Sequence, residues 1–375
     1  MVKKNTKVVA LIVLFILSIS LLAACAGQAT PTPTQAPKAT PVPTKAEQPV
    51  LTPSPTKGIT PLSPPVTVKV GHLGSIAAGG PVYIALEKGY FKELGLNVEL
   101  VPFTTVALMI APLGTGQLDL GADGGISVGI FNAVIREVPI RFIAAGGINS
   151  DAFQADRWLV RKDLIDSGAI KTPADLKGKT VGVVAPGVGM EVVLSAMLAQ
   201  AGLTMKDIIV KQVSYGDQAT AFANKSIDLA FTFEPSRTII METGQVVFWK
   251  STHSIVPGYT STYVMYSPLF MQNNAEAAKR FMLARMKAVR EYNNAIKNKK
   301  LDEVINILIK YTALKDKAIY AKMNWSLIDE GRIDRNNLQI FIDYFEKGGL
   351  LQGKLEMNKL VDDTYVDYAL QVLGK

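Results

Sequence analysis

The sequence predicts an α/β protein with mostly parallel sheets. Short runs of β-branched residues alternate with segments of helical periodicity, as in strands that are joined by crossover helices. This alternation starts at Val66, starts again after Asp156, and gives way to a mainly helical stretch over residues 274–375. A chain of 375 residues can hold two ordinary domains. We therefore expect two successive α/β units followed by a helical tail.

The first unit is predicted to contain four strands. Val66–His72 alternates as a half-buried strand does, and further strands are expected at 97–102, 118–121 and 140–145. Helices are expected at 81–94, from Thr105 to about Gly116, and at 125–135. Pro81 suits the first helical position and Gly95 the stop. Strands separated by helices of this length predict a sheet that is covered by helices.

Ligands of parallel sheets bind beyond the carboxyl ends of the strands, so the loops 74–80, 123–127 and 147–151 are candidate binding segments. Their candidate residues, with two hydroxyls that end the second strand, are Ser75, Gly80, Thr104, Thr105, Asp123, Ser127 and Asp151. The threonines would either donate to a ligand or cap the next helix. Asp123 would either pair with a cationic ligand or begin a helix, where a carboxylate is favoured. Asp151 would otherwise lie in a solvated loop.

The second unit is organised around residues 176–191. Thr180–Val184 is predicted to be a buried strand, a Pro/Gly turn follows it, and helical periodicity starts at Gly189 and stops at Gly202. A strand that ends in a glycine turn at a helix N-terminus leaves backbone N–H groups free for a polar ligand. The alternative is an ordinary turn that glycines merely shape. The candidate residues here are Gly187, Val188, Gly189 and Glu191.

The remaining elements of the second unit follow the same alternation. Strands are expected at 157–160, 209–213, 229–233, 246–249 and 262–266, with helices at 217–223 and 235–242. Thr172 to Asp175 has the composition of a helix start, with an N-cap threonine, a proline and an acidic first turn.

The N-terminus is predicted to be an export signal. Three lysines precede an apolar run from Val8 to Leu17, and Leu22-Ala-Ala-Cys25 follows. The alternative is an uncleaved transmembrane anchor, although the run is near the lower length limit for a span. Leu-Ala-Ala-Cys resembles the bacterial lipobox, in which the cysteine becomes the diacylated first residue. We therefore expect residues 1–24 to be removed and Cys25 to anchor the protein to the outer face of a membrane.

Residues 25–65 are predicted to be a tether. Eleven of the 20 prolines lie between Pro31 and Pro65, and such a segment favours extended chain without a core. Six lysines and one glutamate precede residue 66, so the formal charge of +8 falls to +3 over residues 66–375, which does not favour nucleic acid. Cys25 is the only cysteine, which excludes disulfides within the chain and a cysteine-based metal site.

Three segments carry a family resemblance. Residues 83–96, residues 172–182 and the pair Glu234-Pro235 resemble signatures of ABC-transporter solute-binding proteins. Specifically, the sequence is similar to the family that binds sulfonates, taurine, nitrate and thiamine pyrimidine precursors. The resemblance covers residues 66–255 well and the tail loosely.

The resemblance implies the type II periplasmic binding protein fold. Lobe one would comprise residues 66–155 and 255–375, and lobe two residues 156–254, with a two-strand hinge between them and the helical tail on lobe one. A small molecule would be clamped between the lobes and delivered to a permease with a separate ATPase. The resemblance implies a monomer without catalysis, cofactor or metal. Glu234 would either face the cleft or hold the hinge.

The expected ligand is neutral or cationic. Sulfonate and taurine binders carry Ser or Thr in the loop after the central strand of lobe two, whereas residues 186–190 hold none and Glu191 would repel an anion. With Asp123, Asp151 and Glu234, this favours a heteroaromatic amine such as a thiamine pyrimidine. Open alternatives are a sulfonate, taurine or nitrate binder, an enzyme of pyrimidine-precursor synthesis on the same fold, and a sensory or adhesive lipoprotein.

Two further groups of side chains have open roles. Four aromatic residues would either stack on a planar ligand or lie in the core, namely Trp158, Tyr215, Trp249 and Tyr259. Five cations on the helix over 274–297 would either meet anionic lipid or form a solvated face, namely Lys279, Arg280, Arg285, Lys287 and Arg290.

Overall fold

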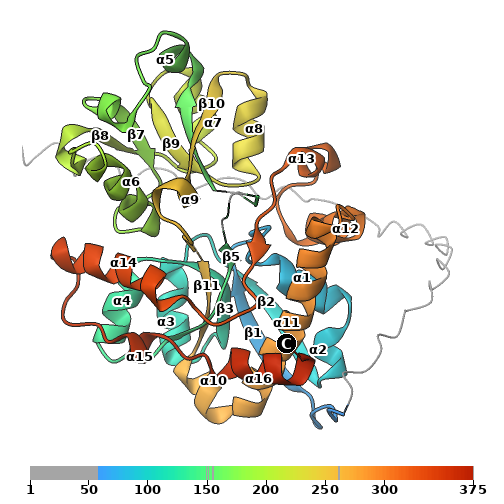
Figure 1. The fold of residues 1–375 in the computed structure, drawn as a ribbon. Coiled ribbons are helices and arrows are strands. Elements are labelled where there is room, and N and C mark those ends of the chain that lie inside the picture. The colour runs from blue at the N-terminus through green and yellow to red at the C-terminus, as the bar shows by residue number, and fades with distance from the viewer. Residues whose placement is uncertain (1–57, 149, 151, 154–155, 261, 375) are drawn as a thin grey trace, which may run out of the picture. The chain divides into compact units, whose positions relative to one another are not determined.

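The computed structural model describes residues 58–148, 150, 152–153, 156–260 and 262–374 (Figure 1). The predicted export signal, Cys25, most of the tether and Asp151 lie outside this range. Within it the chain forms two α/β lobes, each around a five-stranded sheet, and a helical C-terminal region. The predicted fold class is thereby confirmed, while the predicted lobe boundaries stay a prediction.

The sheet of lobe one has the strand order β2-β1-β3-β11-β4. The bounds are β1 Val66–His72, β2 Leu96–Pro102, β3 Leu120–Gly125, β4 Arg141–Ala145 and β11 Thr262–Tyr266. β1 pairs in parallel with β2 and β3, whereas β11 is antiparallel to both β3 and β4. β11 enters this sheet after the whole of lobe two has been made, so lobe one is built from two separate stretches of chain.

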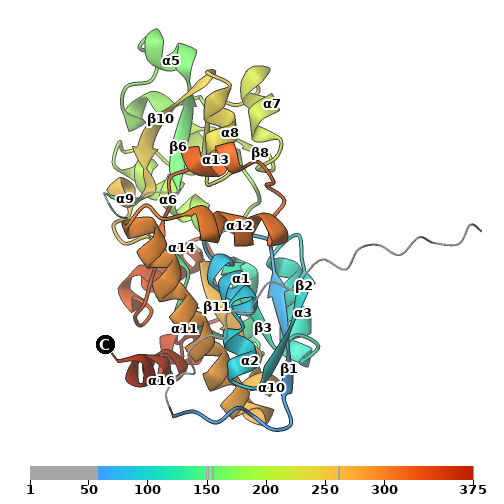
Figure 2. The ribbon, with the colours of Figure 1, turned by 90° about the vertical axis from the view of Figure 1, so that its right-hand side faces the viewer.

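Helices cover both faces of this sheet (Figure 2). On one face the apolar core holds residues of α1 Gly80–Glu87, α2 Tyr90–Glu93, α11 Ala275–Lys297 and α16 Thr364–Leu373. The apolar core on the other face contains residues of α3 Ala107–Thr115 and α4 Val128–Ile135. The predicted helix over 81–94 is divided at Gly89, whose φ of 75° interrupts the helix.

The sheet of lobe two has the order β10-β6-β9-β7-β8. The bounds are β6 Arg157–Arg161, β7 Thr180–Val183, β8 Ile209–Gln212, β9 Leu229–Thr232 and β10 Val246–Ser251. β7 is parallel to β8 and β9, and β6 is antiparallel to β9 and β10. The helices are α5 Lys162–Asp166, α6 Gly189–Ala199, α7 Gln218–Ala223, α8 Ser236–Glu242 and α9 Thr252–Ile255, with short 3₁₀ turns at Pro173–Leu176 and Met205–Asp207. The helix start predicted at Thr172–Asp175 is the first of these 3₁₀ turns, and Thr172 and Asp175 form a capping box there.

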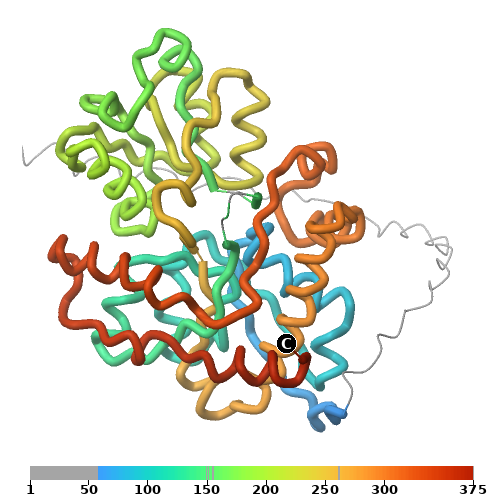
Figure 3. Tube along the Cα trace, viewed as in Figure 1, coloured from blue at the N-terminus to red at the C-terminus, as the bar shows by residue number. Residues whose placement is uncertain are grey.

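The chain crosses between the lobes twice, after β4 and after β10 (Figure 3). Next to the first crossing, β5 Gly147–Ile148 pairs with β12 Leu327–Ile328 of the C-terminal region. Gly146 is packed so closely that a methyl group there would lie 2.0 Å from Thr262 Oγ1 in β11. The two crossings therefore start from a tightly packed base in lobe one.

The C-terminal region consists of helices that contact both lobes. Besides α11 and α16 it contains α10 Pro268–Asn273, α12 Asp302–Tyr311, α13 Lys317–Lys322, α14 Arg335–Lys347 and α15 Met357–Leu360. α13 contacts α8, and α14 contacts α6, in addition to the contacts of α11 and α16 with lobe one. The expectation that the tail packs on lobe one was therefore correct but incomplete. No helix in the described part of the chain is both long and apolar enough to span a membrane.

The predicted basic face of α11 is wrong at Arg285. This side chain is fully buried and donates from Nη2 to the carbonyl oxygen of Ala145 at 3.1 Å. The helix buries 13 of its 23 residues, so its apolar face is wider than the sequence pattern suggested, and Arg285 falls inside it. Burial lowers the pKa of Arg285 to about 10, so it stays charged at neutral pH.

Candidate functional site

Asp123 lies inside β3 and is almost completely buried. Its carboxylate accepts hydrogen bonds from Leu73 N at 2.9 and 3.2 Å, from Ser75 N at 3.3 Å and from Ser75 Oγ at 2.7 Å. Burial raises its pKa, and these donors oppose the rise. β3 runs to Gly125 and α4 starts only at Val128, so Asp123 does not begin a helix. It instead ties the loop after β1 to the middle strand of the sheet.

A group of aromatic residues lies at the same edge of the sheet, formed by His72 at the end of β1, Tyr83 in α1 and Tyr311 at the end of α12. His72 Nδ1 lies 3.0 Å from Tyr83 Oη, and the Tyr83 ring stacks on Tyr311 with centroids 4.9 Å apart. Burial lowers the pKa of His72 below its ordinary value of 6.5, although the charge of Asp123 opposes this. The imidazole is therefore neutral at pH 7. Tyr83 is fully buried, while His72 and Tyr311 are partly exposed.

In lobe two, the turn after β7 holds its own carboxylate. Gly187 has a φ of 71°, which favours glycine, and its N–H donates to Glu191 Oε2 at 2.9 Å. Burial raises the pKa of Glu191, and the bond from Gly187 opposes this rise. One of the backbone donors predicted to be free for a ligand is thus used by Glu191.

The two lobes meet through the backbone at this turn. Val128 N donates to Gly187 O at 2.9 Å, and Gly189 N donates to Ile126 O at 3.2 Å. Ser127 and Val188 lie opposite each other in an antiparallel bridge. These bonds bring together predicted site residues that are about 60 positions apart in the sequence. The carboxyl edge of β3 in lobe one therefore contacts the carboxyl edge of β7 in lobe two.

Ser127 and Gly189 are both buried in this contact. Ser127 is 9% exposed, and its hydroxyl has no hydrogen-bond partner among the described residues. A methyl group at Gly189 would lie 3.1 Å from Phe341 and 3.4 Å from Ile126, so a side chain here would press on both the tail and lobe one. An unpaired buried hydroxyl at a junction between lobes is a group that a bound molecule would satisfy.

Glu234 is buried at the end of β9, and protein groups occupy its carboxylate. It forms an ion pair with Arg237, accepts from Thr238 N at 3.2 Å and accepts from Asn324 N at 3.0 Å. Asn324 belongs to the C-terminal region, so this contact also joins the lobes. Burial lowers the pKa of the nearby Arg157, and the charge of Arg237 contributes to the decrease.

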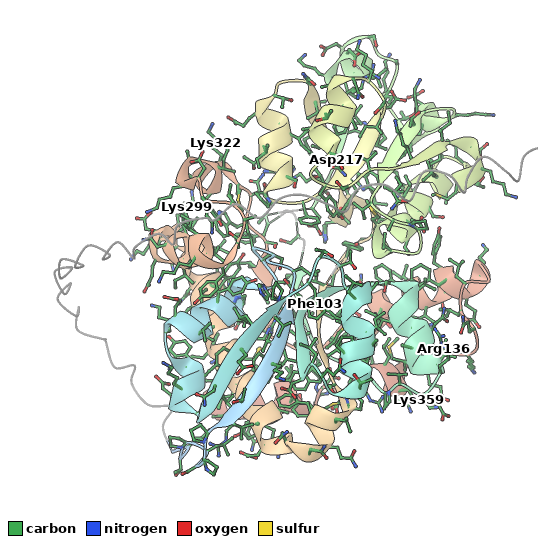
Figure 4. All side chains as sticks on the ribbon, turned by 180° about the vertical axis from the view of Figure 1, so that it is seen from behind. Phe103, Arg136, Asp217, Lys299, Lys322 and Lys359 are labelled. Carbon is green, nitrogen blue, oxygen red and sulfur yellow. The ribbon has the colours of Figure 1, made fainter. Side chains whose placement is uncertain are left out.

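The other predicted site residues have simpler surroundings. Ser75 Oγ accepts from Gly79 N at 3.0 Å, and buried Gly80 packs near Tyr292 and Leu308. Thr104 and Thr105 are exposed beside Phe103, which Figure 4 labels. Neither threonine caps α3, whose N-cap is Val106. Asp151 lies outside the described residues.

The aromatic candidates divide into two pairs. Trp158 and Tyr259 are buried in the core, whereas Tyr215 and Trp249 are partly exposed. Tyr215 packs edge-on against Phe233 at the end of β9, with centroids 4.3 Å apart. The partly exposed rings of Tyr215 and Trp249 can therefore contact a planar ligand, whereas the rings of Trp158 and Tyr259 are enclosed by the core.

Sequence reasoning missed His72, Tyr83, Tyr311, Arg237 and Asn324. His72 ends the first predicted strand, and the rule that placed candidates beyond strand ends would also have selected it. Tyr83 and Tyr311 are 228 positions apart, and Glu234 and Asn324 are 90 apart. A single sequence carries no signal for such pairs, since each member looks like an ordinary helix or loop residue.

Curated relatives agree on binding more than on catalysis. The chain is 27% identical over 240 residues to a putative binding protein of Brucella abortus. That alignment covers 63% of this chain and 70% of the relative. It is 22% identical over 268 residues to the formylaminopyrimidine-binding protein of Halalkalibacterium halodurans, which covers 71% and 73%. A shorter match of 33% over 104 residues, 28% of each chain, is to a 4-amino-5-hydroxymethyl-2-methylpyrimidine phosphate synthase of Aspergillus parasiticus.

Solved structures share the fold. The periplasmic aliphatic sulphonate binding protein of Escherichia coli matches with a TM-score of 0.63 at 19% identity, over 79% of this chain and 92% of that one. The periplasmic nitrate-binding protein of Synechocystis PCC 6803 matches with a TM-score of 0.64 at 17% identity, over 84% and 90%. The chain thus has the fold of periplasmic solute-binding proteins. The model of the NMT1/THI5-like family matches residues 78–297, more than half of the sequence, and the chain belongs to that family.

Proposed function

We propose that the protein is the extracytoplasmic solute-binding component of an ABC importer, which clamps a small organic molecule between its two lobes. The observation that carries this proposal is the backbone contact between Ile126–Val128 and Gly187–Gly189. It joins the edges of the two sheets at which parallel sheets bind ligands. A ligand that binds best to the joined arrangement shifts the lobes toward it.

The proposed ligand is a neutral heteroaromatic molecule, with an aminopyrimidine the leading candidate. Asp123, Glu191 and Glu234 all accept hydrogen bonds from protein donors. They therefore favour a cationic ligand less than the number of acidic residues in the sequence suggested. The partly exposed rings of Tyr215 and Tyr311 offer flat apolar contacts. The pyrimidine-binding relative supports the same class. The alternative within the family is a sulfonate or nitrate anion.

The proposed contacts are the unpaired Ser127 hydroxyl and the His72 imidazole. They would lie beside the Gly187–Gly189 turn, whose Gly187 N–H, Gly187 carbonyl and Gly189 N–H already bond to protein groups. Because Nδ1 of His72 already bonds to Tyr83 Oη, only Nε2 is left for a ligand, as a donor or an acceptor according to the tautomer. The Ser127 hydroxyl can both donate and accept, and the two residues together suit the donors and acceptors of an aminopyrimidine edge. Ser75, Thr104 and Thr105 stay candidates at the outer part of the same sheet edge.

Thermal unfolding with a panel of ligands tests this proposal. The panel contains 4-amino-2-methylpyrimidine and its formylamino derivative, alkylsulfonates, taurine and nitrate. A ligand at about a hundred times its Kd adds roughly 2.7 kcal/mol to stability, which gives a clear rise in Tm. We expect the pyrimidines to raise Tm and the anions to have no effect. Stabilisation by a sulfonate or nitrate alone would instead assign the anion alternative.

Delivery to a permease and anchoring through Cys25 are part of the same proposal. Vesicles that contain the permease and its ATPase should take up labelled ligand only when the binding protein is present. The enzyme alternative draws on the short match to the fungal synthase. Incubation of the protein with the panel, followed by mass spectrometry, separates the two, because a binding protein returns each compound unchanged.

A further inference from the structure

The C-terminal region contains a segment that reaches both lobes, residues 322–329, which we call the strap. It runs from the end of α13 through β12 to Asp329. Figures 1 and 2 show α13 beside α8 of lobe two, and Lys322 at the end of α13 is labelled in Figure 4. The strap is neither of the two chain crossings between the lobes. Its link to lobe two is not covalent, and it adds to the bonds between Ile126–Val128 and Gly187–Gly189 and to the contact of α14 with α6.

One end of the strap is fixed to lobe one and to the base of the first crossing. Asn293 in α11 binds Ile328 twice, from Nδ2 to the carbonyl oxygen and from the Ile328 N–H to Oδ1, both at 2.9 Å. β12 pairs with β5, and Asp329 N donates to Gly146 O at 3.2 Å. Asn293 is buried in the core of lobe one. This end of the strap therefore moves with lobe one.

The other end of the strap holds lobe two through Asn324. Its N–H donates to Glu234 Oε1 at 3.0 Å. Its side-chain amide is assigned with the oxygen toward Arg237, because the opposite assignment sets N–H donors against the N–H donors of the guanidinium. In this orientation the oxygen accepts from Nη1 at 2.6 Å and from Nη2 at 2.7 Å. Asn324 thus contacts both members of the Glu234–Arg237 ion pair. The side chains of that pair are only 4% and 5% exposed.

The chemistry of this contact is matched. A buried guanidinium requires acceptors, and Asn324 supplies one amide oxygen to two of its nitrogens. A buried carboxylate requires donors, and the Asn324 N–H supplies one. All three bonds involve a charged group, and such hydrogen bonds are about twice as strong as neutral ones. If the lobes separated here, both charges would lose a protein partner and would have to be hydrated.

We infer that Asn324 is a positioning residue that latches lobe two to the strap and thereby biases the protein toward the joined arrangement of its lobes. This rests on the proposed clamp function and adds a determinant that touches no ligand. Breaking the latch weakens binding of any ligand that requires joined lobes, mainly by speeding dissociation. The adjacent pair of Lys322 and Glu242 also links the strap to lobe two, but both side chains are about half exposed, and such pairs contribute little.

The test measures the distance between the lobes without ligand, so it does not depend on which ligand is correct. In the full chain with Cys25→Ser, spin labels are placed at Lys359→Cys in lobe one and Lys206→Cys in lobe two, both exposed positions. Asn324→Leu keeps the size and the backbone N–H but removes the acceptor for Arg237. Asn324→Asp keeps an acceptor, and Lys322→Ala is the control on the same strap.

Pulsed electron–electron double resonance measures the distances between the two labels. In Asn324→Leu the population with the longer distance should be about ten times that of the parent chain, because a hydrogen bond to a charged group is lost. Asn324→Asp and Lys322→Ala should match the parent. An unchanged distribution in Asn324→Leu, with or without a lower urea midpoint, overturns the inference and leaves Asn324 a structural residue. A parent chain that populates only the long distance overturns it as well. Failure of the clamp function shows separately, as distances that no ligand of the panel changes.

Discussion

Replacement of Asp123 distinguishes a structural carboxylate from a ligand-binding one. In Asp123→Ala, Leu73 N, Ser75 N and Ser75 Oγ lose their shared acceptor. Hydrogen bonds to a charged group contribute about 1.5–3 kcal/mol each, but three that share one carboxylate are not additive, and water reaches the partly exposed Ser75. We therefore expect the free energy of unfolding to fall by about 3 kcal/mol. Burial of the carboxylate offsets some of this gain, as its raised pKa indicates.

Urea unfolding followed by circular dichroism, without ligand, measures this effect. With an m-value of about 3 kcal/mol/M, the midpoint should fall by about 1 M. Asp119→Ala is the matched control, because Asp119 precedes the same strand and accepts one bond from Lys69 N at 2.7 Å while partly exposed. Its expected cost is about 1.5 kcal/mol, about half of that for Asp123→Ala, because a single bond is lost at a partly exposed carboxylate. If Asp123→Ala kept the parent midpoint and lost only ligand affinity, the carboxylate would be a ligand contact and the structural reasoning would be refuted.

Three further predictions concern the turn of lobe two, the histidine and the anchor. Gly187→Ala should weaken ligand binding more than Gly178→Ala, and titration calorimetry of the two variants measures this. Both glycines have φ near 70°, but only a methyl group at Gly187 would meet the other lobe, 2.8 Å from Val128. Since the pKa of His72 is depressed in the folded protein, its contribution to stability is present above pH 6.5 and is lost as the pH falls through the pKa of the folded state. Chemical unfolding at pH 7 and pH 5 should therefore show a smaller loss of stability in His72→Gln than in the parent. Cys25→Ala should abolish incorporation of labelled fatty acid into the protein, whereas a variant that is still labelled would exclude lipidation at Cys25.

The sequence was sufficient for the elements and the fold class because these depend on local patterns. Val66–His72 was predicted with the bounds that β1 has, since its alternation and its flanking Pro65 mark both ends. The position of β11 was not predictable in the same way. Thr262–Tyr266 was recognised as a strand, but its place between β3 and β4 depends on a pairing across more than 100 residues. Only the family resemblance supplied an expectation for that return of the chain.

The candidate site was predictable as a location and not as a set of contacts. The rule that ligands lie beyond strand ends selected Ser127 and Gly187–Gly189, and these meet across the lobes. The same rule selected Thr104 and Thr105, which stay exposed. Whether a predicted residue lies in the contact depends on which loop of one lobe faces which loop of the other. That pairing is made by hydrogen bonds between distant parts of the chain.

The acidic residues show why a count of charges in a sequence does not give the charge that a ligand meets. Four carboxylates near strand ends suggested a ligand that is neutral or cationic. In the described structure Asp123 accepts hydrogen bonds from the loop after β1, Glu191 accepts one from its own turn, and Glu234 pairs with Arg237 and accepts from Asn324. Because burial of an unpaired carboxylate costs far more than burial of one that accepts several hydrogen bonds, a folded chain brings donors to its buried acids. The electrostatic preference of a cleft is therefore set by the acids left without donors and the bases left without acceptors. In this protein the expected ligand is thereby narrowed from a neutral or cationic molecule to a neutral ring.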